Sequence, residues 1–406
     1  MRPILCKVLI PVVLAGSAAP AVAQDAGARA RDLGITFGGE AGAHGAITDV
    51  PGVTVGHTTL VRGEGRLVVG QGPVRTGVTA ILPRGSSDEP VFAAVHALNG
   101  NGEMTGTIWI EESGLMWGPV MITNTHSVGA VHEGVIAWSI GRGLEAWSLP
   151  VVAETYDGFL NDINGFHVRP EHAVAALDSA RGGRVAEGNV GGGTGMVCHG
   201  FKGGIGTASR VLPADAGGYT VGVLVQCNYG SRRLFAVEGV PVGAELNDPA
   251  LRPCRAGDFE PGSPWFRTAP GCASAEGARG EERDDGVGSI IVVVATDAPL
   301  LPHQLDRIAR RVPLAIGKMG GLGENSSGDI FLAFSTQAVA ADSAVGTVRT
   351  LDNDRLNPLF EATVQATQEA ILNALLAART MTGADGIRVH ALPHDRLRAA
   401  MQKYGR

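Results

Sequence analysis

A glycine and a serine stand directly before a run of apolar residues, where they could support nucleophilic chemistry. Gly288-Ser289 precedes Ile290-Ile-Val-Val-Val-Ala-Thr296, and this β-branched run predicts a buried strand. If the chain cleaves itself before the serine, that residue carries both a nucleophilic hydroxyl and a free amine. The pattern therefore predicts a proenzyme, or zymogen, although a glycine-serine turn into a strand is the ordinary alternative.

The chemistry of such a cleavage suits both residues. A serine hydroxyl is a weak nucleophile until a base removes its proton, and an α-amine with a pKa of roughly 7.7–8.0 can do this near neutrality. In the precursor, the same hydroxyl would attack the Gly288 carbonyl. Glycine fits there because it tolerates a strained backbone and has no side chain to obstruct the attack.

Other catalytic motifs do not match the sequence. The stretch His132-Glu133-Gly134-Val135-Ile136 lacks the second histidine of a zinc-protease helix. The sequence has no G-x-S-x-G elbow, no GK[ST] phosphate loop and no G-x-G-x-x-G after a strand. Asp297 and His303 follow Ser289 closely, but triads are defined by geometry, so we interpret them as a turn residue and a residue at a helix start.

The composition predicts a globular protein that acts on small molecules or peptides. The 406 residues are 44% hydrophobic and 18% charged, which is enough apolar material for a large core. The net charge is −7, and no long Lys/Arg run offers a surface for nucleic acid or an anionic membrane.

The first residues resemble an export signal. Arg2 and Lys7 supply the charged region, and an apolar stretch leads to Ala21-Val-Ala23, a small-residue cleavage site. We therefore expect residues 1–23 to be removed, the mature chain to begin at Gln24, and the protein to be periplasmic or secreted. No cysteine follows the site and no later apolar run approaches the ~20 residues of a spanning helix, so we expect no membrane anchor.

Five cysteines become four when Cys6 leaves with the signal, and four allow three pairings. Cys254 and Cys272 share one Pro- and Gly-rich stretch, where an oxidising compartment would permit a disulfide; the sequence leaves a free pair open. Cys198 and Cys227 lie in apolar, strand-like runs. We interpret these two as small buried hydrophobic residues.

The elements needed to position the serine alternate between strands and helices, which predicts one α/β domain. Helical periodicity is clearest over 302–311 and 358–379. A long exposed insertion, rich in Pro, Gly and charge, spans about 247–286 and ends just before Gly288. The predicted buried strands are 77–82, 219–226, 289–296 and 330–335.

An ordered series of motifs resembles a known family. The stretch from Asp285 to Leu305 is similar to the signature of the self-processing serine aminopeptidases, the family of DmpA (L-aminopeptidase/D-amidase/D-esterase) and of the β-peptidyl aminopeptidases. The resemblance extends from about Asp32 to the C-terminus. Further motifs with family counterparts are Ile47-Thr-Asp-Val-Pro-Gly-Val-Thr-Val-Gly-His57, Arg75-Thr-Gly-Val-Thr79, Val151-Val-Ala-Glu-Thr-Tyr156, Gly188-Asn-Val-Gly-Gly-Gly-Thr-Gly195, Val221-Gly-Val-Leu-Val-Gln226 and Asn325-Ser-Ser-Gly-Asp329.

The resemblance implies a four-layer αββα sandwich, similar to the N-terminal-nucleophile hydrolases but with a different topology. It also implies self-cleavage between Gly288 and Ser289. The products would be a large subunit, 24–288, and a small subunit, 289–406, which stay together in one domain. Family members form tetramers of this two-chain unit, so we expect a homo-oligomer.

The resemblance also assigns catalytic roles. Asn228 matches the residue that donates its amide to the oxyanion hole; alone, it would equally fit a turn before Tyr229. Ser327 and Asp329 match the serine and acid that orient and help activate the nucleophile, whereas Ser-Gly-Asp turns are usually only solvated.

Three further residues match the lining of the substrate site. Glu154 is the candidate counter-ion for the substrate ammonium, Tyr156 would donate a hydrogen bond near the reacting carbonyl, and Trp147 would form a pocket wall or belong to the core. None of these roles requires a metal or another cofactor.

The sequence thus predicts a serine aminopeptidase that hydrolyses short peptides, amino-acid amides or esters through an acyl-enzyme on Ser289. Because β-peptidyl members tend to have Glu at the Asp329 position and to lack Tyr156, these residues favour α-amino-acid substrates. The alternatives are a β-peptidyl aminopeptidase, an acyltransferase like the ornithine acetyltransferases, which use threonine, and a non-catalytic periplasmic binding protein. The preferred side chain, the stereochemistry and the physiological substrate are left open.

Overall fold

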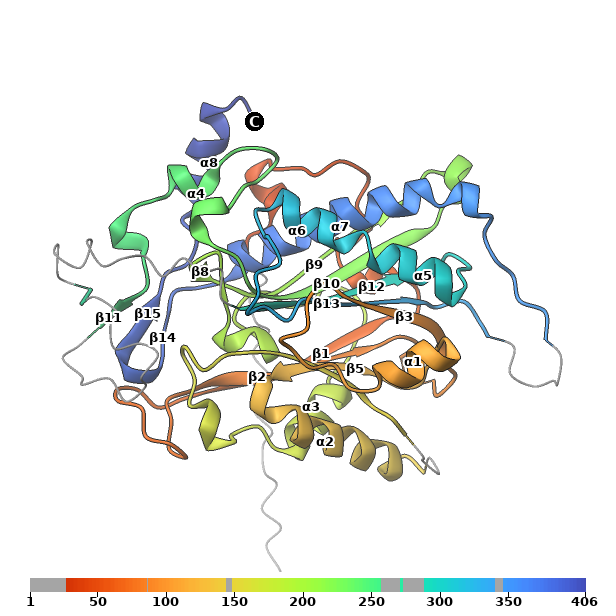
Figure 1. The fold of residues 1–406 in the computed structure, drawn as a ribbon, viewed down its shortest axis with the longest axis horizontal. Helices are drawn as coiled ribbons and strands as arrows, with labels where there is room; N and C mark the ends of the chain where they lie inside the picture. The colour runs from red at the N-terminus through yellow and green to blue at the C-terminus, as the bar shows by residue number, and fades with distance from the viewer. Residues whose placement is uncertain (1–26, 86, 144–147, 257–270, 273–287, 340–345) are drawn as a thin grey trace, which may run out of the picture.

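The computed structural model describes residues 27–85, 87–143, 148–256, 271–272, 288–339 and 346–406 (Figure 1). The predicted signal, Trp147 and most of the 247–286 insertion lie outside these residues. Within the described part of the chain, no helix is long and apolar enough to cross a membrane.

Two sheets form the centre of the molecule. One has four strands in the order β1-β2-β5-β6, and the other has six in the order β4-β3-β13-β12-β10-β9. The four-stranded sheet consists of Thr54–Arg62 (β1), Val74–Leu82 (β2), Val120–Asn124 (β5) and Val151–Thr155 (β6). The six-stranded sheet consists of Leu115–Met116 (β4), Val91–Ala97 (β3), Ile330–Ser335 (β13), Ser289–Thr296 (β12), Thr220–Asn228 (β10) and Gly204–Val211 (β9).

Helices cover the outer face of each sheet, so the molecule has four layers (Figure 1). The six-stranded sheet is covered by Pro302–Ala309 (α5), Val312–Lys318 (α6) and Asn357–Ala377 (α7), and the four-stranded sheet by Val128–Gly141 (α2) and Pro170–Asp178 (α3). Smaller elements are Thr107–Ser113 (α1), Val242–Glu245 (α4), His394–Lys403 (α8), the sheet of Cys254–Arg255 (β11), Ile387–Val389 (β15) and Met381–Thr382 (β14), and the pair Val197–Cys198 (β7) and Phe201–Lys202 (β8). This arrangement confirms the predicted αββα sandwich.

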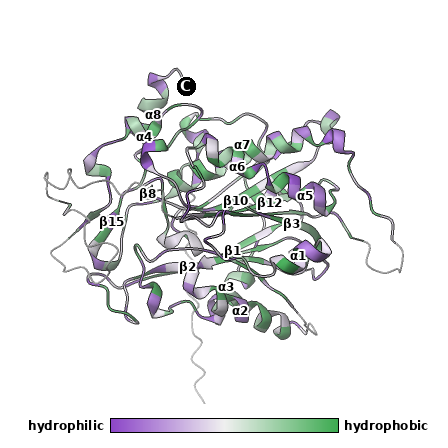
Figure 2. Cartoon of the chain, viewed as in Figure 1, coloured by the Kyte–Doolittle hydropathy of each residue, from purple (hydrophilic) through white to green (hydrophobic). Residues whose placement is uncertain are grey.

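Side-chain alternation along β12 divides the core. Ile290, Val292 and Val294 belong to the apolar cluster beneath α5, α6 and α7, whereas Ile291 and Val293 belong to the cluster between the sheets. Strand residues two apart share a face, so Ser289 faces the space between the sheets. Figure 2 shows hydrophobic colours on the central strands, while hydrophilic colours gather on the outer helices and loops.

The predicted elements agree with the structure, with differences at their ends. The strands predicted at 289–296 and 330–335 have the bounds of β12 and β13. The helix predicted over 302–311 ends two residues earlier, at Ala309, and a separate helix, α6, starts at Val312 with a proline in its first turn. Proline has no backbone N–H, so it begins a helix more readily than it continues one.

Both cysteine pairs form disulfides. The structure joins Cys254 to Cys272, which settles the pairing that the sequence left open. It also joins Cys198 to Cys227, whose Cα atoms are 5.6 Å apart. The prediction that these two are merely small buried hydrophobic residues was therefore wrong, although both are buried. Apolar runs indicate burial, but they do not reveal that β7 lies beside the end of β10.

Candidate active site

Ser289 is the first residue of β12 and lies where three backbone segments meet. It is buried, it pairs with Asn228 in the antiparallel ladder of β10 and β12, and its Oγ accepts a hydrogen bond of 2.9 Å from the N–H of Gly328. Gly288 has φ 135°, and a Cβ there would overlap the Asn228 carbonyl oxygen and lie 2.9 Å from its carbon. The Gly288–Ser289 bond therefore runs along the end of β10 in a conformation that excludes other side chains.

The Ser-Ser-Gly-Asp turn before β13 approaches Ser289 through the parallel pairing of β12 with β13. Ser327 Oγ donates a 2.6 Å hydrogen bond to Asp329 Oδ1, which also accepts one of 3.2 Å from the Ile290 N–H. Both side chains are buried, so this is not the solvated turn that the sequence left as an alternative. Burial raises the pKa of Asp329, and the bonds from Ser327 and Ile290 oppose that rise.

A loop after β3 supports this turn, and the sequence did not predict it. Asn99 Oδ1 accepts a 2.6 Å hydrogen bond from the Asp329 N–H, and Asn101 Nδ2 donates one of 2.7 Å to the Ser326 carbonyl. A Cβ at Gly328 would lie 2.5 Å from the Asn101 carbonyl oxygen. The only sequence signal is that polar, turn-forming residues follow a strand, which does not reveal a partner more than 200 positions away.

Asn228 ends β10, and both ends of its amide are used. Its Oδ1 accepts a 2.8 Å hydrogen bond from the Val197 N–H, and its Nδ2 donates one of 3.0 Å to the Tyr156 carbonyl. A Cβ at Gly288 would lie 3.4 Å from Nδ2. Since one N–H of the amide goes to Tyr156, the other is left for an acceptor beside the Gly288–Ser289 bond. Asn228 pairs with Ser289 at the end of the ladder of β10 and β12, so its amide lies beside the start of β12.

Glu154 lies in β6, close to the turn that contacts Ser289. Its Oε1 accepts a 3.0 Å hydrogen bond from the Glu103 N–H, and its Oε2 accepts one from Thr125. A Cβ at Gly102 would lie 2.9 Å from the Gly328 Cα and 3.4 Å from Glu154 Oε1, so Gly102 lies between them. Burial raises the pKa of Glu154, while the bonds from Thr125 and Glu103 lower it and favour the carboxylate. Thr125 was not predicted.

Tyr156 joins the site mainly through its backbone carbonyl. Its side chain is 39% exposed, and its hydroxyl lies beside Gly158. Burial raises the pKa of this phenol, and Asp157 raises it further, so the phenol stays protonated and able to donate. The predicted pocket residue Trp147 lies outside the described residues.

The sequence and structure match known proteins over nearly the whole chain. Residues 45–389 match peptidase family S58. The chain belongs to this family. It is 54% identical to the β-peptidyl aminopeptidase BapA of Sphingosinicella microcystinivorans, a match that spans 98% of this chain and 97% of that protein.

Two solved structures support the assignment of this chain to family S58. A β-aminopeptidase from Burkholderia sp. is 46% identical, with a TM-score of 0.79, and covers 93% of this chain and 99% of its own. The L-aminopeptidase D-Ala-esterase/amidase of Ochrobactrum anthropi is 45% identical, with a TM-score of 0.80 and the same coverage, and is described as a prototype serine aminopeptidase with a variant N-terminal-nucleophile hydrolase fold. The predicted family, fold class and enzyme class are thereby confirmed.

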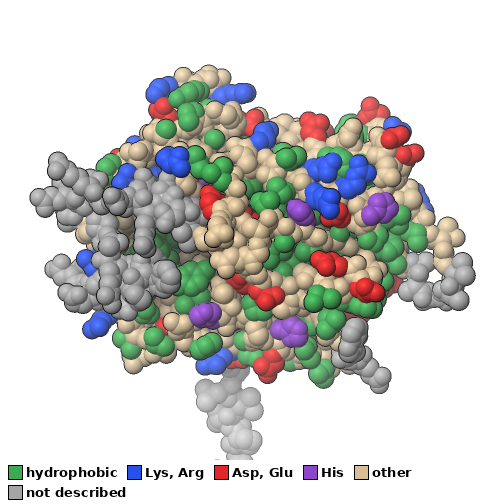
Figure 3. Space-filling model, in the orientation of Figure 1, with side chains coloured by type: hydrophobic (Ala, Val, Ile, Leu, Met, Phe, Trp, Pro, Cys, Tyr) green, Lys and Arg blue, Asp and Glu red, His purple; other side chains and the backbone are tan. Residues whose placement is uncertain are grey.

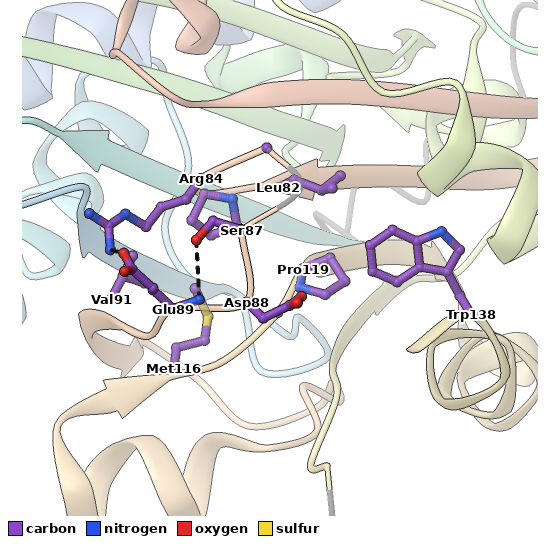
Figure 4. Close-up of a pocket in the computed structure, with 12 residues that line it drawn as sticks. Leu82, Arg84, Ser87, Asp88, Glu89, Val91, Met116, Pro119 and Trp138 are labelled. Carbon is purple, nitrogen blue, oxygen red and sulfur yellow. Dashed lines mark hydrogen bonds and ion pairs between the residues drawn. The ribbon is translucent and has the colours of Figure 1, made fainter. Parts of the chain in front are cut away.

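A small pocket of the S58 enzyme lies apart from these residues. It is formed between the ends of β2 and β4 and the side of α2 (Figure 4), and the ion pair of Arg84 with Glu89, 2.6 Å, lies at its edge. It is lined by Leu82, Pro83, Arg84, Gly85, Ser87, Asp88, Glu89, Val91, Met116, Gly118, Pro119 and Trp138. No residue of the Ser289 site lines it.

Among the described residues, no cluster of three or more His, Cys, Asp or Glu is arranged to hold a metal ion.

Proposed function

We propose that this S58 enzyme is an exported serine aminopeptidase that activates itself by cleavage before Ser289. It would then hydrolyse short peptides, amino-acid amides or esters through an acyl-enzyme. The observation that carries the proposal is the position of Ser289, between the Asn228 amide and the buried pair of Ser327 and Asp329. By analogy with the family, the two-chain units would assemble into an oligomer.

In the first stage, Ser289 Oγ attacks the Gly288 carbonyl carbon. A C–O bond forms, the C–N bond breaks, and the hydroxyl proton passes to the Ser289 nitrogen. Water then hydrolyses the resulting ester, which leaves a carboxylate on Gly288 and a free amine and hydroxyl on Ser289. The Asn228 amide, beside Gly288, would stabilise the oxyanion of this step.

In each later turnover, the Ser289 amine takes the proton from its own hydroxyl, which attacks the substrate carbonyl. Asn228 donates to the oxyanion, and the protonated amine gives its proton to the leaving group. Water then attacks the ester carbonyl of the acyl-enzyme, with the Ser289 amine again taking and returning the proton, and the amino acid is released. Asp329, bonded to Ser327 and to the N–H of Ile290, fixes the start of β12 during both steps.

Glu154 would bind the free ammonium of the substrate. Its carboxylate already accepts two hydrogen bonds, which hold it in place and favour its charge. A charged partner here restricts the enzyme to substrates with an unblocked amino end. This is why the site favours an aminopeptidase over an endopeptidase.

A second candidate, the β-peptidyl aminopeptidase, is favoured by one observation. The chain is 54% and 45% identical to two proteins named β-peptidyl aminopeptidase, over 98% and 94% of its length. Against this, Asp329 and Tyr156 favour α-amino-acid substrates. The two classes differ by one methylene between the ammonium and the reacting carbonyl, so the span from Glu154 to Ser289 decides between them.

A panel of substrates tests both proposals. Purified enzyme and the Ser289→Ala variant are given an L-α-aminoacyl anilide, a D-alanyl amide and a β-homoaminoacyl anilide. Hydrolysis by the enzyme but not the variant supports the serine aminopeptidase, and the better substrate identifies the class. Turnover of the β-homoaminoacyl anilide alone contradicts the α-amino-acid preference. Acyl transfer to an added amine that exceeds hydrolysis contradicts the aminopeptidase and supports the acyltransferase. A folded, uncut and inactive chain supports the binding protein.

A further inference from the structure

A lysine that plays no part in the chemistry above is buried behind the oxyanion-hole residue. Lys202 in β8 is fully buried, and its Nζ donates to the carbonyls of Met196 at 2.7 Å, Gly203 at 2.8 Å and Gly193 at 3.3 Å. Burying an ammonium is costly unless its donors are satisfied, and here three carbonyls satisfy them. Burial lowers the Lys202 pKa to about 7, the nearby charge of Asp157 opposes this change, and the three carbonyl acceptors favour the ammonium because a neutral amine has only two N–H donors.

The shortest of these bonds leads to Asn228 through one peptide group. The Met196 carbonyl that accepts from Lys202 and the Val197 N–H belong to the same peptide, and that N–H donates 2.8 Å to Asn228 Oδ1. The Asn228 amide in turn donates to the Tyr156 carbonyl. The ammonium, the peptide and the side-chain amide therefore form one head-to-tail chain of hydrogen bonds.

Such a chain both orients and polarises its last member. The Val197 N–H can only donate and the Tyr156 carbonyl can only accept, so the Asn228 amide has one orientation, with Nδ2 toward the site. Hydrogen bonds in series strengthen each other in a low-dielectric interior. A cation on the Met196 carbonyl makes the Val197 N–H, and then the Asn228 N–H, a better donor.

The segment that carries this peptide is held tightly. β7 and β8 pair Val197 with Lys202, so the lysine lies opposite the residue whose N–H it polarises. A Cβ at Gly195 would lie 2.9 Å from the Cβ of Asp157, which shows how closely this loop packs on the residue after Tyr156. The two partners of the Asn228 amide, the donating Val197 N–H and the accepting Tyr156 carbonyl, therefore belong to segments that pack together beside Lys202 and Asp157.

We infer that Lys202 is a positioning residue of the oxyanion hole, which holds and polarises the Met196–Val197 peptide so that Asn228 is oriented as a strong donor. This inference rests on the proposed function, because Asn228 must stabilise the oxyanion. It adds a buried cation, which lies behind the residues that face the substrate, to the groups that determine kcat.

A double-mutant cycle tests the inference, with kcat measured for each variant only after intact mass shows that cleavage before Ser289 is complete. Lys202→Met, which keeps the length of the side chain but removes its donors, is combined with Asn228→Ala. Because loss of a single oxyanion donor costs about 10²–10³ in kcat, loss of its support should cost about 10-fold or more in kcat, with KM nearly unchanged. In the Asn228→Ala background, Lys202→Met should have little further effect. Multiplicative effects would overturn the inference.

The control is another buried cation, Arg210, whose bonds within the described residues go to Gly38, Ser209, Gln365 and Glu369 and not to the Asn228 network. Arg210→Met should combine with Asn228→Ala multiplicatively. If Lys202→Met does not fold, Lys202→Gln, which keeps N–H donors but not the charge, replaces it in the same cycle. Its effect on kcat should also disappear when Asn228 is already alanine. A wild-type enzyme without turnover refutes the proposed function, whereas an active enzyme with multiplicative effects refutes only the role of Lys202.

Discussion

Replacing Gly288 by alanine should block self-activation without unfolding the protein. Gly288 has φ 135°, a conformation that L side chains rarely adopt, and it lies against the end of β10. An added methyl group would overlap the Asn228 carbonyl oxygen and lie 2.9 Å from its carbon. It cannot be accommodated where Gly288 now lies, so this segment must move.

The size of the effect follows from that movement. Real Cβ atoms essentially never approach another atom within 3.0 Å, so the backbone at 288 must move by on the order of 1 Å or change its φ. A misplacement of about 1 Å at a reacting centre costs roughly 10²-fold in rate. The displaced bond also loses its position beside Asn228 Nδ2. We therefore expect Gly288→Ala to slow self-cleavage by about 100-fold or more.

Intact mass measured against time after expression provides the assay, together with circular dichroism to confirm folding. Gly317→Ala serves as the control, because Gly317 is in α6 and nothing lies within 4 Å of its added Cβ. That variant should mature at the wild-type rate. A folded Gly288→Ala protein that matures as fast as wild type would refute the steric reasoning.

Three further predictions concern charge and protonation. Glu154→Gln should raise KM for free-amine substrates by roughly 10- to 100-fold, because a bond to a charged group contributes about 1.5–3 kcal/mol; steady-state kinetics that show equal KM values contradict the counter-ion role. Ser327→Ala removes a bond that lowers the Asp329 pKa, so the acidic limb of the pH–rate profile should move to higher pH, and a shift to lower pH would exclude Asp329 as its source. His57 is partly buried, with its ring Nε2 inside the protein, and its pKa is lowered from 6.5 to about 4, chiefly by burial. The unfolded chain therefore binds the proton first, and the stability that neutral His57 provides above pH 6.5 is lost as the pH falls to 4. The test compares the Ser289→Ala variant, which stays uncut, with the Ser289→Ala/His57→Asn double variant. Between pH 6.5 and pH 4, the free energy of unfolding by urea should fall by about 3 kcal/mol more for the variant that keeps His57. Equal falls for the two variants would contradict this prediction.

The strands around the nucleophile could be predicted because their composition changes sharply at each end. β12 starts at Ser289, directly after Gly288, and β13 follows Gly328-Asp329; both are apolar runs whose predicted bounds match the structure. Periodicity does not reveal which strands are neighbours. The parallel pairing of β12 with β13, which brings Asp329 to the N–H of Ile290, could be expected only from the family resemblance.

The supporting contacts could not be predicted, since they join distant segments through single hydrogen bonds. Asn99 and Asp329 are 230 positions apart, and neither stands in a pattern that names the other. Lys202 lies in a glycine-rich stretch, Gly200-Phe-Lys-Gly-Gly204, where a lysine would ordinarily be exposed. Only the fold shows that carbonyls enclose its ammonium.

On the face shown in Figure 3, acidic and basic side chains both occur among apolar and neutral ones. Such a face offers no broad basic field for a polyanion.

Intact mass with N-terminal sequencing of the purified protein, beside the Ser289→Ala variant, tests the central claim most directly. We predict a second chain that begins Ser-Ile-Ile-Val and is absent from the variant, because the hydroxyl of Ser289 performs the cleavage and the new amine serves as its base. A wild-type protein that hydrolyses peptides as a single uncut chain would contradict the account, since the proposed base would not exist.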